Sequence, residues 1–277
     1  MTVFDAAIVQ MRSGTVVADN VASMKGLVTS AAKAGASYVQ TPEMTGLVQQ
    51  SRKEFFATVF EQSDDPLVEA ASELASELGI YVHIGSTPIR ISDSQAANRA
   101  FLFATDGRLQ ATYDKIHMFD VDLDNGESWR ESAVYRPGTE AVATDVNGAK
   151  LGIAICYDLR FPRLHNMYAQ NGVEILTGPS CFTRQTGQAH WHALMRSRAI
   201  ETGSFMIAAA QGGDHEDGRT TYGHSLIVNP WGEVIAEVSG EEPGFDIAKI
   251  DTEAVLAARN KVPNLKNERD FSFMEIN

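Results

Sequence analysis

The sequence predicts a mixed α/β sandwich in which helices cover the faces of β-sheets. Strand-like apolar runs alternate with segments of helical periodicity along all 277 residues. Asp106-Gly107 and Asn147-Gly148 each separate two strand-like runs, which is typical of tight hairpin turns. The sequence contains neither a linker nor a repeat nor a low-complexity stretch, so nothing in it marks a domain boundary.

Strands are predicted where apolar and β-branched residues cluster between turn residues. The first run, Val3–Met11, contains Asp5 and Gln10, so it indicates a strand rather than a signal peptide. The predicted strands are Val3–Met11, Ser37–Gln40, Ile80–Thr87, Ala97–Thr105, Arg108–Thr112, Val142–Val146, Lys150–Ile155, Val173–Thr177, Phe205–Ala210, Gly223–Val228, Val234–Val238 and Phe245–Ile250.

Helices are predicted where apolar residues recur at helical spacing and a terminating residue follows. Gly35 and Gly79 stand where a helix needs a left-handed C-terminal residue. The segment Lys115–Arg136 has little periodicity, and long loops of this kind tend to carry function. The predicted helices are Val16–Ala34, Pro66–Leu78, Arg160–Gln170, Gln188–Glu201 and Thr252–Asn260.

The composition is that of an ordinary globular protein, with 44% apolar and 21% charged residues. There are 23 lysines and arginines against 36 acidic residues, a net charge of −13, which argues against binding nucleic acid. The longest apolar runs are far shorter than the roughly 20 residues of a membrane helix. Two cysteines suit a reducing compartment. We therefore expect a soluble, cytoplasmic protein with neither a nucleic-acid nor a membrane partner.

Cys156 is the sharpest chemical feature of the chain. It ends the buried-strand pattern Leu151–Ile155 and precedes a helix, where free backbone N–H groups favour a thiolate and could stabilise an oxyanion. The simpler interpretation is a small apolar residue that fills the end of a strand. A histidine base is possible, but none of the seven histidines lies in a cysteine-protease pattern.

Two further charged residues follow predicted strands. Glu43 comes just after the strand 37–40, and Lys115 stands between a strand and the long loop. Because α/β active sites assemble at the carboxyl ends of strands, both are candidates for the same site. Taken singly, each is most simply a solvated surface charge.

Short motifs around these residues occur in a fixed order from about Val3 to the C-terminal helix. They are Thr41-Pro42-Glu43, Asp114-Lys115-Ile116-His117, Asn125-Gly126-Glu127-Ser128, Arg136-Pro137-Gly138, Ile155-Cys156-Tyr157-Asp158-Leu159-Arg160-Phe161-Pro162, Gly187-Gln188-Ala189-His190-Trp191, Arg196-Ser197-Arg198-Ala199-Ile200-Glu201 and Tyr222-Gly223-His224-Ser225.

In this order the motifs resemble the carbon–nitrogen hydrolase (nitrilase) superfamily. The stretch Arg219–Ser225 and the later Asn229-Pro230-Trp231-Gly232 are similar to its Nit branch, which includes deaminated-glutathione amidases and ω-amidases. Cys156-Tyr157-Asp158 also favours that branch over true nitrilases, which usually carry Cys-Trp-Glu.

The resemblance implies a four-layer α-β-β-α sandwich of the nitrilase type. It implies a single carbon–nitrogen hydrolase domain over residues 1–277, with a short C-terminal tail from about 262. The family assembles as dimers, so we expect a homodimer or a larger homo-oligomer. Its chemistry needs neither a metal nor an organic cofactor.

The family's catalytic residues fall on three positions of this chain. Glu43 is the general base, Cys156 the nucleophile and Lys115 the cation that meets the oxyanion. Glu127 matches the family's second glutamate, which positions the substrate and tunes the other three. Its alternative interpretation is an exposed loop acid.

Substrate-binding residues are less clear from the sequence. Arg160 could bind a substrate carboxylate bidentately, or could form an ion pair at the start of a helix. Arg184 lies in a loop beside the family's pocket, and Tyr157 is expected to line it. Cys181 replaces a residue that is often alanine, and we expect it to pack rather than react. His192 replaces a glutamate usual in the branch.

The function implied is a thiol amidase that cleaves a small carboxylate-bearing amide to acid and ammonia through a cysteine thioester. Deaminated glutathione is the first substrate to consider. ω-Amidase activity on α-keto acid amides and N-carbamoyl amidohydrolase activity are the alternatives. A scaffold that kept the fold and lost turnover is a different class. A metal-dependent hydrolase using His190 and His192 is disfavoured, because residues two apart diverge on a helix.

Overall fold

Two six-stranded sheets form the centre of the computed structural model, which describes residues 1–123, 126 and 128–276. The first sheet has the order β16-β1-β2-β3-β4-β5 and the second the order β15-β14-β11-β10-β9-β8. In the first sheet β1, β2 and β3 run parallel, and in the second β9, β10 and β11 do. The other strands add antiparallel edges. The strands of the first sheet are β1 Val3–Gln10, β2 Tyr38–Gln40, β3 Tyr81–Arg90, β4 Ala96–Phe103, β5 Leu109–Asp114 and β16 Gly244–Asp251. Those of the second are β8 Val142–Val146, β9 Ala149–Ile153, β10 Ile175–Thr177, β11 Phe205–Ala208, β14 Leu226–Val228 and β15 Val234–Glu237.

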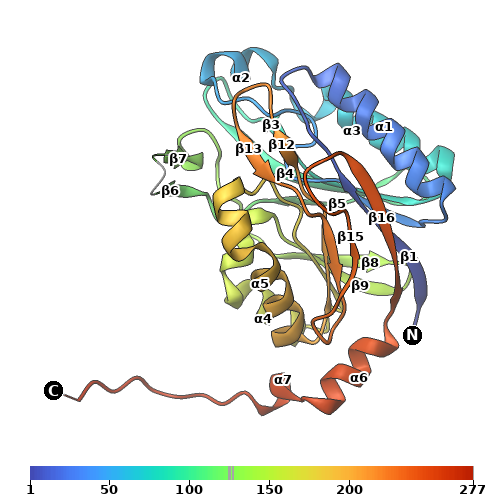
Figure 1. The fold of residues 1–277 in the computed structure, drawn as a ribbon, viewed down its shortest axis with the longest axis vertical. Coiled ribbons are helices and arrows are strands. Elements are labelled where there is room, and N and C mark those ends of the chain that lie inside the picture. Colours follow the sequence, from blue (N-terminus) through green and yellow to red (C-terminus); the bar gives the residue numbers. More distant parts are fainter. Residues whose placement is uncertain (124–125, 127, 277) are drawn as a thin grey trace.

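Helices cover the outer face of each sheet (Figure 1). Helices α1 (Val17–Lys33) and α3 (Pro66–Leu78) pack on the first sheet, and α4 (Pro162–Gln170) and α5 (Arg184–Thr202) on the second. The predicted α-β-β-α sandwich is therefore confirmed.

Both faces of the first sheet are buried, and the residues of strand β1 divide between these two faces. In β1, Phe4 and Ile8 point between the sheets, whereas Ala7 and Val9 belong to the cluster under α1 and α3. Successive strand residues face opposite sides of a sheet, so a nearly continuous apolar run is needed when both sides are covered.

Capping residues set the ends of the helices that the sequence predicts. The Asp65 side chain accepts hydrogen bonds from the first N–H groups of α3, and Gly79 ends that helix with a φ of 64°. Helix α5 begins at Arg184, earlier than the predicted Gln188, because the Thr183 hydroxyl caps its first turn. The remaining helices are α2 Arg52–Thr58, α6 Glu253–Lys261 and α7 Asn264–Asn267, of which α2 and α7 were not predicted.

The long segment 115–136 is not featureless. It contains the small hairpin of β6 (Asp120–Asp122) and β7 (Ser128–Arg130), followed by a 3-10 turn at Glu131–Ala133. A second hairpin, β12 (Gly212–Asp214) with β13 (Thr220–Tyr222), carries the acidic residues 214–217 at its tip. Both hairpins bring polar residues toward the edge where the two sheets meet.

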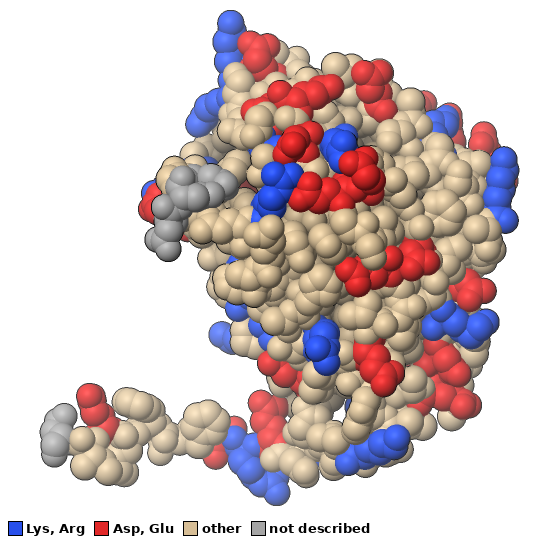
Figure 2. Space-filling model, viewed as in Figure 1, with Lys and Arg blue, Asp and Glu red and all other residues tan. Residues whose placement is uncertain are grey.

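The chain end and the surface complete the picture. Residues 268–276 have no regular secondary structure and run away from the sheets (Figure 1). Figure 2 shows acidic and basic side chains interspersed over one face, without an extended basic area. Within the described ranges, the structure contains no helix that is both long and apolar enough to cross a membrane.

Candidate active site

Cys156 lies at the turn that leaves strand β9 of the second sheet. It opens the 3-10 turn Cys156–Arg160, and its own backbone has a φ of 46°. Left-handed backbone at a residue other than glycine costs of order 1–3 kcal/mol and is found at functional sites. The Cys156 N–H donates to the Pro179 carbonyl at 2.9 Å, which holds this conformation. The side chain is 7% exposed, so the thiol meets solvent only through a narrow opening.

The Asp158 carboxylate stabilises this turn by accepting hydrogen bonds from several neighbouring groups. One carboxylate oxygen accepts hydrogen bonds from the Ile155 N–H at 2.9 Å and the Tyr113 hydroxyl at 2.7 Å. The other accepts the His117 N–H at 3.0 Å and lies 2.6 Å from the His117 Nδ1. Tyr113 belongs to β5 and His117 follows it, so Asp158 ties the cysteine turn of the second sheet to the first sheet.

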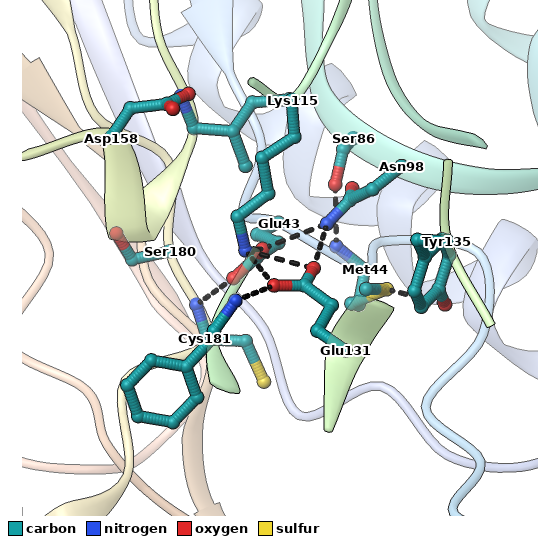
Figure 3. Close-up of polar contacts among 12 residues, drawn as sticks. Glu43, Met44, Ser86, Asn98, Lys115, Glu131, Tyr135, Asp158, Ser180 and Cys181 are labelled. Carbon is teal, nitrogen blue, oxygen red and sulfur yellow. Dashed lines mark hydrogen bonds and ion pairs between the residues drawn. The ribbon is translucent and has the colours of Figure 1, made fainter. Parts of the chain in front are cut away.

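Lys115 extends from the end of β5 into a buried pair of carboxylates (Figure 3). Its Nζ donates to Glu43 Oε1 at 2.8 Å and to the two Glu131 oxygens at 2.9 and 2.8 Å. The lysine side chain is only 2% exposed. Burial lowers the pKa of Lys115, but the charges of Glu131 and Glu43 outweigh it and hold the pKa well above its usual value. The ammonium is therefore permanent.

Glu43 lies in the turn that follows β2, and both of its oxygens are used. Oε1 also accepts from the Asn98 amide at 2.9 Å, and Oε2 accepts the Cys181 N–H at 2.8 Å. The next residue, Met44, has a φ of 58°, and its N–H donates to the Ser86 hydroxyl on β3. The carboxylate is thus held from both sheets.

Glu131 is a member of this buried cluster that sequence reasoning missed. Besides Lys115, it accepts hydrogen bonds from the Phe119 N–H at 2.6 Å and the Asn98 amide at 3.1 Å. The second carboxylate was predicted at Glu127, which lies outside the described residues. The only signal in the sequence was the long segment 115–136 without periodicity. The path of this segment, which brings Glu131 back to Lys115, was not predicted from it.

The buried surroundings of Cys156 favour its thiol over its thiolate. Burial raises the pKa of the thiol well above its usual value, the Glu43 carboxylate raises it further, and the Lys115 ammonium opposes both. A cysteine in this setting needs a base in order to act as a nucleophile, and the neighbouring Glu43 carboxylate is the candidate.

A cavity of about 290 Å³ opens over the thiol and is lined by aromatic and charged side chains. Its walls include Glu43, Lys115, Glu131 and Cys156, and also Tyr157 and Arg160, as the sequence analysis expected. Arg184 is not among the residues that line it. The Arg184 guanidinium pairs with Glu241 at 2.7 Å and Asp214 at 2.9 Å, so the structure does not bring this predicted residue to the site.

Cys181 and the histidine pair have other surroundings. Cys181 lines the cavity beside Glu43, and burial raises its pKa to about 11. On α5, His190 faces Arg160 at 3.3 Å and His192 faces Glu237 at 3.2 Å, so the two rings contact different groups. Among the described residues, no three His, Cys, Asp or Glu side chains gather in a metal-binding arrangement.

A carboxylate, an ammonium and a thiol thus lie together where the two β-sheets face each other. Comparison with known proteins shows to which class of protein this arrangement belongs. The carbon–nitrogen hydrolase family model matches residues 5–260, and this chain belongs to that family of enzymes. Deaminated glutathione amidase of Yersinia enterocolitica is 36% identical over 268 residues, 96% of this chain and 93% of that protein. Omega-amidase NIT2 of Homo sapiens is 33% identical, covering 97% and 96%.

A solved structure agrees with the fold. The crystal structure of Saccharomyces cerevisiae Nit3, described as a member of branch 10 of the nitrilase superfamily, matches with a TM-score of 0.83 and 28% identity. The match covers 94% of each chain. Two facing sheets with outer helices are therefore shared along nearly the whole length, which confirms the resemblance noted in the sequence.

Proposed function

We propose that this enzyme is a thiol amidase that hydrolyses a small carboxylate-bearing amide through a thioester on Cys156, with deaminated glutathione as its first candidate substrate. One observation carries the proposal. The thiol lies on a strained turn at the floor of a cavity whose wall holds a buried Glu43–Lys115 pair. The names of the relatives support the substrate class.

In the first step, the Cys156 sulfur attacks the amide carbonyl carbon while the Glu43 carboxylate takes the thiol proton. The carbonyl electron pair moves to oxygen. Lys115 supplies a fixed positive charge for this oxyanion, and the N–H of Tyr157 at the start of the 3-10 turn is the second donor. A buried, preorganised ammonium stabilises developing charge more strongly than water does.

In the second step, the carbon–nitrogen bond breaks and the leaving nitrogen takes the proton from Glu43, so that ammonia departs. Water then attacks the thioester as Glu43 accepts one of its protons. The carbon–sulfur bond breaks, and Glu43 returns the proton to the sulfur. The products are ammonia, a carboxylic acid and the original thiol, so Glu43 acts alternately as base and acid.

Glu131 supports this cycle without exchanging protons. Its two oxygens hold the Lys115 ammonium in place, which leaves Glu43 free to become protonated without releasing the lysine. We propose this positioning role for Glu131, and Glu127 remains the position that matches the family motif.

The test is ammonia release from wild type and Cys156→Ala side by side. The amides are deaminated glutathione, α-ketoglutaramate, an N-carbamoyl amino acid and a simple aliphatic amide. We expect turnover of deaminated glutathione, its loss in the variant, and a thioester mass on Cys156 in quenched wild type. α-Ketoglutaramate turned over faster would instead support the ω-amidase alternative, as the second relative's name does.

Silence of wild type on all four amides, together with the absence of a thioester mass on Cys156 in quenched samples, would favour the scaffold alternative. We also propose a cytoplasmic homodimer. The exposed apolar side chains of Ile200 on α5, Leu256 on α6 and Phe271 in the C-terminal segment support an assembly that would cover them. A monomer mass by light scattering at micromolar concentration would contradict it.

A further inference from the structure

A buried guanidinium stands in the cavity wall without a strong partner. Arg219 precedes β13, lines the cavity, and has a side chain only 16% exposed. Its Cζ lies 4.7 Å from the centre of the Trp129 ring, so the indole face supports the guanidinium. Neither the proposed mechanism nor the family motifs give this residue a task.

The hydrogen-bond donors of Arg219 are poorly used. Among the described residues, its Nε has no hydrogen-bond partner although it is buried. One Nη donates to the Cys181 sulfur at 3.7 Å, and the other lies 3.7 Å from Asp217, beyond ordinary hydrogen-bond length. A guanidinium has five N–H donors in a planar fork, and leaving them unpaired in a buried place costs free energy. Its anionic partner among the described residues, Asp217, forms only a long ion pair, so most of the guanidinium donors do not contact an anion.

The other arginines of the cavity wall are differently placed. Arg130 donates hydrogen bonds from one Nη to the Asp122 carboxylate and from the other to backbone carbonyls. Arg52 donates to the carbonyls of Ala133 and Ser94. Arg160 is less constrained, but it lies over Phe182 at 5.5 Å with its Nη2 3.3 Å from His190 Nδ1. Arg219 alone in this group combines burial with a free inner donor.

Arg219 is also linked to the reacting groups. The Cys181 sulfur accepts from its guanidinium, and the Cys181 N–H donates to Glu43. One residue therefore separates the guanidinium from the base. A substrate whose amide carbonyl sits over Cys156 would extend its other end along this wall.

We propose that Arg219 binds the carboxylate of the substrate, at the end remote from the amide, through its Nε–H and a neighbouring Nη–H. A planar carboxylate matches that fork bidentately. Contact with the Trp129 ring orients the plane of the guanidinium. Asp217 lies 3.7 Å away, which is too far to occupy the N–H donors with short hydrogen bonds. This inference rests on the proposed amidase function and makes the substrate class an ω-carboxyl amide.

The first experiment measures binding without turnover. Cys156→Ala is titrated calorimetrically with glutaramate, which carries one amide and one carboxylate, and with its neutral methyl ester. The same titrations are made on C156A carrying Arg219→Met, Arg219→Lys or, for the competing carboxylate-binding candidate from the same wall, Arg160→Met.

We expect R219M to weaken glutaramate binding by roughly 10- to 100-fold, the usual worth of a charged hydrogen-bonded pair. Ester binding should change less than threefold. R219K should recover part of the loss, because it restores charge without the fork, and R160M should leave the preference for glutaramate intact. Equal losses for acid and ester in R219M, or a loss of preference confined to R160M, would overturn the proposal, as would absence of glutaramate binding to C156A.

The second experiment separates this inference from the amidase proposal. In the Cys156 background, kcat and KM for glutaramate and its ester are compared in wild type and R219M. A rise in KM for the acid alone supports carboxylate binding, and an equal fall in kcat for both overturns it in favour of a role through Cys181 and Glu43. Acid-selective binding by C156A that R219M weakens, together with silence of wild type on the four amides and on glutaramate, would refute the amidase proposal while supporting the Arg219 assignment.

Discussion

The two sheets resemble each other in topology and differ in what they bring to the site. The first sheet supplies charge, since Glu43 follows β2 and Lys115 follows β5. The second supplies the thiol of Cys156 after β9 and the donor N–H of Cys181 after β10. Glu43, Cys156 and Cys181 follow the carboxyl ends of parallel strands, where backbone groups are free of the ladder, whereas Lys115 follows β5, which pairs antiparallel with β4.

The difference extends to the backbone. Beside Glu43 the left-handed residue is its neighbour Met44, whereas Cys156 is itself left-handed. A long side chain such as that of Lys115 can reach the site from an ordinary backbone conformation. The short side chain of Cys156 has little reach, so the conformation of its turn determines where the thiol lies. Neither half is a reactive site alone, which makes their contributions separable by mutation.

The largest effect should come from the second sheet. Cys156→Ala should lower kcat by about 10⁴-fold or more, since removing a nucleophile collapses the whole catalytic unit. The free energy of unfolding should change by less than about 1 kcal/mol, because a small side chain in the same conformation replaces another. Ammonia release and urea unfolding measure the two. A variant that kept a tenth of the activity would show that another group carries the reaction.

Removing the cation of the first sheet should damage activity and stability together. Lys115→Met leaves Glu43 and Glu131 facing each other in a buried place, which should cost about 3–5 kcal/mol of unfolding free energy at neutral pH. Activity should fall about 10³-fold through loss of the oxyanion charge. Lys25→Met, at an exposed pair with Glu73, is the control and should cost less than about 1 kcal/mol. Similar losses in the two variants would contradict the buried-cluster account.

Glu131→Gln tests which carboxylate positions the Lys115 ammonium beside the first sheet. The amide keeps one oxygen toward Lys115 but removes a charge, so we expect kcat to fall about 10- to 100-fold, with a smaller effect on KM. Glu127→Gln is the comparison, because the family motif points to it and the geometry to Glu131. Steady-state kinetics of both variants would decide which carboxylate supports the lysine. A larger loss in E127Q would reverse the assignment.

The smallest effect concerns two buried histidines, His83 on β3 and His165 on α4. Burial lowers the pKa of His83 to about 3 and that of His165 to about 4, so both are neutral when folded. The unfolded state takes up protons below its ordinary histidine pKa of about 6.5 and the folded state does not, so stability falls as pH drops from about 6.5 toward 4. Each histidine contributes at most about 1.4 kcal/mol per pH unit.

His83→Gln keeps a hydrogen-bonding group for the Tyr38 hydroxyl but removes the titration. Its unfolding free energy, measured by urea at pH 4, 5 and 6, should depend less steeply on pH than that of wild type. His190→Gln, at an exposed position on α5, is the matched control and should leave the slope unchanged. An unaltered slope in H83Q would mean that His83 does not resist protonation.

Sequence reasoning reached the parts of the site that depend on local structure. Cys156, Glu43 and Lys115 became candidates because each follows a predicted strand, and the resemblance of the ordered motifs to the family gave them their roles. Glu131 could not be found, since its place depends on how a loop of irregular backbone returns to Lys115. Arg184 was misplaced for the same kind of reason, because its partner Glu241 lies 57 positions away and only the fold brings them together.

The protonated state of Cys156 has a consequence outside the catalytic cycle. Peroxides and electrophiles attack thiolates rather than thiols, so a sulfur with a pKa held well above its usual value is slow to oxidise. Since the base lies beside the thiol and acts when a carbonyl is in reach, reactivity is coupled to occupancy of the cavity. On the proposed mechanism, Cys156 therefore reacts slowly with oxidants while the cavity is empty and becomes nucleophilic when a substrate brings its carbonyl beside the thiol.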